Sequence, residues 1–182
     1  AKSAPHFSTE SPIFTQFSYD AIGRQVQVTN PDGTFATTSY LKDKITQTDA
    51  NGNVKRKYLD AYGRQKRVEE VNGSETYVTT YEYNAIDALT KVTNHLGHVT
   101  TMSYDLMGRK TAMSDSNMGN WTYVYDKAGN LTRQTDAKAQ ILNFEYDLQS
   151  RMTKKIYPDL SQINWTYDDL AVPFSKGRLT KV

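Results

Sequence analysis

The sequence predicts an all-β repeat protein, an array of antiparallel β-hairpins that forms one curved sheet or a short segment of a β-spiral. The first observation is a recurring hexapeptide, typified by residues 104–109, Tyr-Asp-Leu-Met-Gly-Arg. The second is a period of 21 residues, which separates Tyr83, Tyr104, Tyr125, Tyr146 and Tyr167. A fixed period in the twenties is typical of repeat architectures. The third is the alternation of apolar and polar residues before each hexapeptide, which favours strands.

The composition agrees with a thin sheet and excludes several functions. The 182 residues have a mean hydropathy of -0.70, but an aromatic content of 12% argues against disorder. The net charge of +2 is spread over all repeats, so no nucleic-acid partner is predicted. No apolar run approaches the roughly 20 residues of a membrane span. Because Cys is absent, disulfides and thiolate chemistry are excluded.

The chain order divides into a lead-in or linker at residues 1–12 and a repeat array at residues 13–182. Each repeat starts with a strand such as that of Trp121, Tyr123 and Tyr125, whose side chains share one face. A second strand follows the hexapeptide, and an opposite turn closes the repeat, so we expect about seven hairpins. The opposite turns are predicted at Pro31-Asp32-Gly33, Asn51-Gly52, Asn72-Gly73, Leu96-Gly97, Met118-Gly119 and Pro158-Asp159.

Three places depart from this pattern. The interval from Tyr40 to Tyr58 is short and the interval from Tyr58 to Tyr83 is long, and a changed turn is expected after Tyr40 because residues 40–45 contain no Gly. Residues 137–140 also lack a turn-forming Gly or Asn, so that turn rests on spacing alone. The last repeat, from residue 167 to 179, carries extra residues that predict an enlarged loop. Because the chain starts without a signal peptide and stops as a strand begins, we expect a piece of a longer protein.

The hexapeptide has the residues of a type I turn followed by a left-handed residue. We expect Asp to accept hydrogen bonds from the N–H groups two and three residues on, and Gly to take the positive φ. Ser150 stands at a Gly position, where we expect about 1 kcal/mol of strain or a different turn. Tyr is expected to stack its ring on the neighbouring Tyr and to present its hydroxyl to solvent or a partner. Arg109 is expected to pair with Asp105 or with the Asp of an adjacent hairpin.

These residues are therefore predicted to be structural, and no catalytic, cofactor-binding or metal-binding residue is predicted. The motif residues are Tyr19, Asp20, Gly23, Arg24, Asp60, Gly63, Arg64, Tyr83, Tyr104, Asp105, Gly108, Arg109, Tyr125, Asp126, Gly129, Tyr146, Asp147, Arg151, Tyr167 and Asp168.

The hexapeptides resemble the YD repeats of the Rhs family, whose pattern is Tyr-Asp-x-x-Gly-Arg-Leu, and the resemblance extends from about residue 13 to residue 182. Related repeats occur in the C component of Tc toxins, in polymorphic toxins and in teneurins. The resemblance implies a β-sheet that spirals into a hollow shell around a C-terminal toxin or effector domain, in a secreted or bacterial cell-surface protein. The family's self-cleavage region contains an Asp-Pro core motif that is absent here. The resemblance thus carries over the shell, and neither the protease nor the toxin activity.

The sequence also bears on three other functions: catalysis, metal binding and carbohydrate binding. Regular recurrence at turns favours capping over catalysis for the carboxylates, so an enzyme is not predicted. His95 and His98 flank a turn and could contact a metal, but neither Cys nor an acidic third ligand is adjacent. The aromatic and amide side chains support a carbohydrate-binding or adhesion module as the alternative function, with a cell-surface glycan as partner. The exposed edge strands of such an array predict self-association.

Overall fold

The computed structural model describes residues 14–182, so the predicted lead-in at residues 1–12 and the first residue of the array, Ile13, lie outside the described residues. The chain divides into two compact units, the first covering residues 14–82 and 92–97 of the described part and the second covering residues 83–91 and 98–182. No helix long and apolar enough to cross a membrane is found in the described part of the chain.

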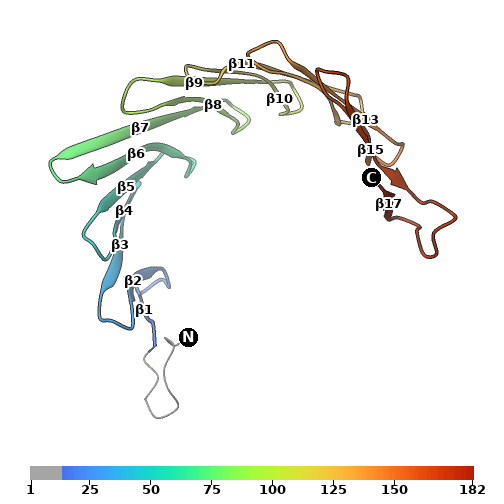
Figure 1. Cartoon of the computed structure of the whole chain (residues 1–182). Coiled ribbons are helices and arrows are strands. Elements are labelled where there is room, and N and C mark those ends of the chain that lie inside the picture. The colour runs from blue at the N-terminus through green and yellow to red at the C-terminus, as the bar shows by residue number, and fades with distance from the viewer. Residues whose placement is uncertain (1–13) are drawn as a thin grey trace. The chain divides into compact units, whose positions relative to one another are not determined.

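Residues 14–182 contain seventeen strands, and fifteen of them follow one another in a sheet whose strand order is the sequence order (Figure 1). The all-β hairpin array is therefore confirmed. The strands of residues 14–83 are β1 (Gln16–Tyr19), β2 (Gln25–Thr29), β3 (Phe35–Leu41), β4 (Lys44–Thr48), β5 (Val54–Leu59), β6 (Gln65–Asn72) and β7 (Glu75–Tyr83). The later strands of the sheet are β8 (Leu89–Thr93), β9 (Val99–Tyr104), β10 (Lys110–Asp115), β11 (Gly119–Tyr125), β12 (Leu131–Thr135), β13 (Ile141–Tyr146), β14 (Met152–Ile156) and β15 (Gln162–Asn164). A separate pair consists of β16 (Thr166–Tyr167) and β17 (Leu179–Lys181).

In the described residues, eight hairpins have their turn at a Tyr-Asp hexapeptide or at the equivalent position of the repeat, one more than predicted. The changed turn after Tyr40 is a two-residue loop, because Leu41 pairs with Lys44 and Lys42 has a φ of 47°. The enlarged last loop is also present, because Tyr167 pairs with Leu179.

Both Asn-Gly pairs lie at turns, as predicted, but the two turns differ. Asn72-Gly73 adjoins a two-residue loop, Gly73 and Ser74, since Asn72 pairs with Glu75. Asn51-Gly52 lies inside a five-residue turn in which Gly52 N–H donates to the Asp49 carbonyl. This second turn is the same as the turn that the Tyr-Asp hexapeptides use.

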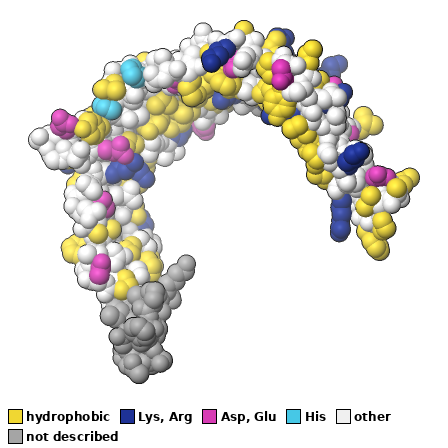
Figure 2. Space-filling view, viewed as in Figure 1, with side chains coloured by type: hydrophobic (Ala, Val, Ile, Leu, Met, Phe, Trp, Pro, Cys, Tyr) yellow, Lys and Arg dark blue, Asp and Glu magenta, His cyan; other side chains and the backbone are white. Residues whose placement is uncertain are grey.

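In strands such as β11 the side chains of one sheet face are half-buried and those of the other face are exposed, whereas β5, β8 and β14 are half-buried along their whole length. In β11, Trp121, Tyr123 and Tyr125 are half-buried and the residues between them are exposed, as alternation predicts. Hydrophobic side chains gather along one side of the strands of the second unit (Figure 2). Val68 is the one buried hydrophobic residue among the described residues. Backbone pairing and half-buried side chains, instead of a closed core, therefore hold the array together.

Candidate functional site: the links between Tyr-Asp turns

The Tyr-Asp turn is a five-residue loop closed by its aspartate. In the turn at residues 105–109, Asp105 N–H donates to the Arg109 carbonyl over 2.9 Å and Gly108 N–H donates to the Asp105 carbonyl over 3.0 Å. The Asp105 Oδ1 atom accepts from the N–H groups of Met107 and Arg109, both at 2.9 Å. The carboxylate thus binds the groups two and four residues on, and not two and three as predicted. The N–H three residues on, that of Gly108, donates to the Asp105 carbonyl instead of the carboxylate.

The fifth position of the hexapeptide takes a positive φ whichever residue occupies it. Gly108 has a φ of 78°, and Ser150 and Asp87 have φ values of 61° and 62°. Ser150 keeps the turn, because its N–H donates to the Asp147 carbonyl over 3.0 Å. Of the two alternatives predicted for Ser150, the left-handed conformation is the one found, and a different turn is not.

Opposite turns use the same geometry, and sequence reasoning missed their aspartates. At the turn that lacks Gly, Asp136 Oδ1 accepts from Lys138 N–H and Gln140 N–H at 2.8 Å, and Ala139 takes a φ of 59°. Asp49 caps its turn in the same way, through Asn51 N–H and Asn53 N–H. For the turn at Asp136 the available signal is its spacing, since Asp136 stands ten residues after Asp126 just as Asp115 stands ten residues after Asp105.

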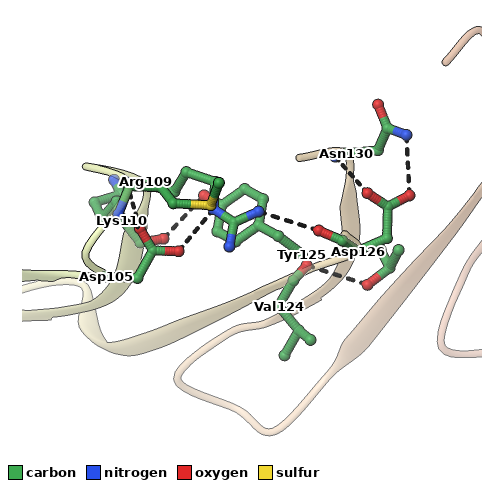
Figure 3. Close-up of polar contacts among 9 residues, drawn as sticks. Asp105, Arg109, Lys110, Val124, Tyr125, Asp126 and Asn130 are labelled. Carbon is green, nitrogen blue, oxygen red and sulfur yellow. Dashed lines mark hydrogen bonds and ion pairs between the residues drawn. The ribbon is translucent and has the colours of Figure 1, made fainter. Parts of the chain in front are cut away.

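Arginine links one turn to the next. The Arg109 Nε atom donates to Asp105 Oδ2 over 2.6 Å, so the pair forms within its own turn. Its Nη1 atom donates to the Asp126 carbonyl over 3.1 Å, and its guanidinium carbon lies 4.9 Å from the centre of the Tyr125 ring (Figure 3). One guanidinium therefore contacts two successive motifs by charge, hydrogen bond and cation–π contact.

Two further arginines make similar links. Arg151 binds Asp147 and Asp168, both at 2.7 Å, and lies 4.4 Å from the Tyr167 ring. Arg24 pairs with Asp20 and lies 4.3 Å from the Tyr40 ring. The rings thus contact guanidinium groups, and the predicted stacking of Tyr on Tyr is wrong. Tyr77 forms an aromatic pair with His95, at 4.7 Å.

Four of the tyrosine hydroxyls bind backbone carbonyls, and for these four the prediction that the hydroxyl faces solvent or a partner is wrong. Tyr125 Oη donates to the Lys110 carbonyl over 2.9 Å, and Lys110 lies two residues beyond the last paired rung of β10 and β11, Ala112 with Thr122. Three other hydroxyls bind the carbonyl fifteen residues earlier, namely those of Tyr40 (to Gln25), Tyr104 (to Leu89) and Tyr146 (to Leu131). The hydroxyl therefore replaces a backbone donor where the ladder between hairpins ends.

The electrostatics follow from these bonds. The pKa of the Asp105 carboxyl is lowered chiefly by the Arg109 backbone N–H, with burial opposing and the Arg109 side chain adding to the effect. Hydrogen bonds from the Asn130 side chain and backbone lower the pKa of Asp126. Burial raises the pKa of the Tyr146 hydroxyl, and the Asp126 charge raises it further. These carboxylates are ionised and occupied by donors, which suits a link and not proton transfer.

A second cluster lies on the opposite face, around a buried glutamate that sequence reasoning did not identify. Glu69 is 8% exposed, forms an ion pair with Arg67 at 2.6 Å, and accepts from Tyr58 Oη over 3.1 Å and from Arg56 over 3.4 Å. Burial and the bond to Glu69 raise the pKa of Tyr58. Tyr58 stands one place before the motif position, which is the signal that it faces the other side of the sheet.

No group of three potential metal ligands lies together in the part of the chain that the structure describes. His95 contacts the Tyr77 ring. The carboxylates of successive motifs are separated by whole hairpins, and the structure brings the motif residues together mainly in pairs. Asp20, Asp60, Asp105 and Asp147 each pair with the Arg of the same turn. Arg24, Arg109 and Arg151 each contact the ring of the following Tyr.

The comparisons with known proteins agree with this architecture. A model of the RHS Repeat family matches residues 83–117 and 125–162. The crystal structure of TcdB2-TccC3-Cdc42 matches with a TM-score of 0.69 and 16% identity over 85% of this chain and 9% of that chain. The structure of the Photorhabdus luminescens Tc holotoxin pore, which carries a mutated TccC3, matches with a TM-score of 0.70 and 17% identity over 84% of this chain and 9% of that chain.

A further crystal structure of TcdB2-TccC3 matches with a TM-score of 0.55 and 15% identity, over 89% of this chain and 12% of that chain. This chain thus spans about a tenth of the length of the chains it matches. At these identities the likeness establishes a shared hairpin-array fold.

Proposed function

This chain is an RHS-repeat (YD-repeat) protein, and we propose that it forms part of the wall of a hollow β-sheet shell that encloses a C-terminal toxin or effector domain. The observation that carries the proposal is the side-chain link from Arg109 to Tyr125 and Asp126, because it joins successive hairpins wherever its residues recur in phase. Such a device extends a sheet by one hairpin at a time, as a wall requires.

The motif residues serve as structural links in this proposal, and residues 13–182 act as one repeat array preceded by a lead-in at residues 1–12. The parent protein is secreted or displayed on a bacterial surface, and the partners of this segment are the rest of its own shell and the enclosed domain. A non-catalytic role is supported by the carboxylates, since Asp105 and Asp147 are each bound by backbone N–H groups and an arginine.

The test is protease protection in the full-length parent protein. We expect the domain that follows the repeats to resist a protease at concentrations that digest the same domain expressed alone. A double variant, Arg109→Ala with Tyr125→Phe, breaks one link and is expected to expose the domain, whereas Tyr123→Phe on the same strand is the matched control. Equal digestion of the enclosed and the free domain would contradict the proposal.

A further inference from the structure

Next to a smaller cleft of about 390 Å³ beside Arg151 and Tyr167, the chain has a larger open cleft at the preceding junction between Tyr-Asp turns. It lies between the turn at residues 126–130 and the turn at residues 147–151, where the pairing of β12 and β13 ends at Arg133 with Asn143. The cavity is about 570 Å³, and its lining includes Asp126, Asn130, Phe144, Tyr146, Asp147 and Leu148.

The junctions before and after this cleft each hold a guanidinium group. In the preceding junction, Arg109 lies against the Tyr125 ring and donates to the Asp126 carbonyl. In the following junction, Arg151 lies against the Tyr167 ring and donates to Asp168. The same chain thus shows twice what occupies the space between a motif aspartate and the next motif tyrosine.

The cleft lacks this occupant because asparagine replaces arginine. The short side chain of Asn130 turns back onto its own Asp126, with Nδ2 2.9 Å from Oδ2, and does not reach the next turn (Figure 3). Among the described residues the Asp126 carboxylate has no ion pair and the Tyr146 ring has no cation over it. The two other carboxylates at the cleft are already paired, Asp147 with Arg151 and Glu145 with Lys154.

We propose that this cleft binds the guanidinium group of an arginine side chain supplied by another polypeptide segment. The incoming group stacks on the Tyr146 ring and binds the Asp126 carboxylate, as Arg109 stacks on Tyr125 beside Asp105. A carboxylate offers about four lone-pair positions, so Asp126 can accept a second donor besides Asn130. Arginine fits better than lysine because its planar group combines ring stacking with forked hydrogen bonding.

The test uses N-acetyl-arginine methylamide as the probe and amide chemical shifts of this chain as the readout. We expect saturable shifts at Ala128, Tyr146 and Leu148, with a dissociation constant of about millimolar for a single side chain. The citrulline analogue, which has the same shape without the charge, is expected to give no saturable shift. The lysine analogue is expected to bind more weakly than the arginine probe.

Two variants separate the cleft from general charge effects. Asn130→Arg places the chain's own guanidinium in the cleft, so binding is expected to disappear, whereas Asn51→Arg adds the same charge in an exposed turn of the other unit and leaves binding unchanged. Asp126→Asn is expected to weaken binding about three- to fivefold. This variant retains the turn, because Asn84 caps the equivalent turn through Ile86 N–H and Ala88 N–H.

Three results would overturn the inference. They are the absence of a saturable shift in the unsubstituted chain, an equal response to the citrulline or lysine analogue, and unchanged binding in both Asn130→Arg and Asp126→Asn. None of them bears on protease protection in the full-length protein, so the proposed wall function is tested separately.

Discussion

Replacing Tyr125 by phenylalanine removes one hydroxyl and leaves the ring against Arg109. The hydroxyl donates to the Lys110 carbonyl over 2.9 Å at a point that the backbone ladder of β10 and β11 does not reach. A hydrogen bond of this kind contributes about 0.5–1.5 kcal/mol net, and an unmet buried carbonyl costs about 1–3 kcal/mol. Because Tyr125 is half-buried and water can reach the carbonyl, we expect a loss of about 1 kcal/mol.

Tyr123→Phe is the matched control. Tyr123 lies two residues earlier on the same face of β11 and is also half-buried, but its hydroxyl has no hydrogen-bond partner among the described residues. Its replacement is expected to change the stability by less than about 0.5 kcal/mol.

The measurement is native-state amide exchange alongside urea unfolding, because repeat arrays can open one hairpin at a time. For Tyr125→Phe we expect faster exchange in β10 and β11 than in β13 and β14. If Tyr123→Phe destabilises the protein as much as Tyr125→Phe, or if exchange accelerates equally in all strands, the hydroxyl is not the link that we infer.

Three further predictions follow from the turns. Ser150→Gly relieves the positive φ of 61° and is expected to stabilise the protein by about 1 kcal/mol, so a lower Tm would contradict the turn strain. A double-mutant cycle of Asp105→Ala with Arg109→Ala is expected to give a coupling of about 0.5–1 kcal/mol, and strictly additive stabilities would show that the 2.6 Å contact contributes nothing. The lowered pKa of Asp105 and Asp147 means that the folded state binds protons more weakly than the unfolded state, so the stability that these two groups contribute is present above their ordinary pKa of 3.8 and is lost as pH falls through the folded-state pKa. Urea titrations between about pH 6 and 2 should show this acid loss, and a stability independent of pH there would refute it.

The periodic parts of the fold could be predicted from the sequence. The alternation of Trp121, Tyr123 and Tyr125 predicts which side chains share a face, and the interval of 21 residues predicts the hairpins. At Ala139 only the spacing predicts a turn, because alanine has no preference for a positive φ. The hydrogen bonds to Asp136 on either side impose this φ.

The contacts between repeats could not be predicted from the motif alone. Tyr and Arg of one hexapeptide are adjacent in sequence, yet Arg109 contacts the Tyr of the following hexapeptide and Tyr125 reaches back to the strand before it. These partners depend on how far the strands of neighbouring hairpins separate near the turns. The 21-residue period of the sequence does not predict that separation. The prediction of stacked tyrosines failed because it assumed that identical residues meet.

The hexapeptide at residues 59–64 has leucine, Leu59, at the position where most others have tyrosine. The contacts around Leu59 explain why the other hexapeptides have tyrosine. Between β4 and β5 the ladder runs from Thr48 with Val54 to Lys44 with Tyr58, and Leu59 N–H then donates to the Asp43 carbonyl over 2.7 Å. No gap is left for a hydroxyl to bridge, and leucine stands at the motif position. Because the backbone ladder is complete there, Tyr58 takes the neighbouring position and its hydroxyl binds Glu69 on the opposite face. Tyrosine is therefore required where the ladder between hairpins stops short, and its hydroxyl, more than its ring, accounts for its place in the repeat.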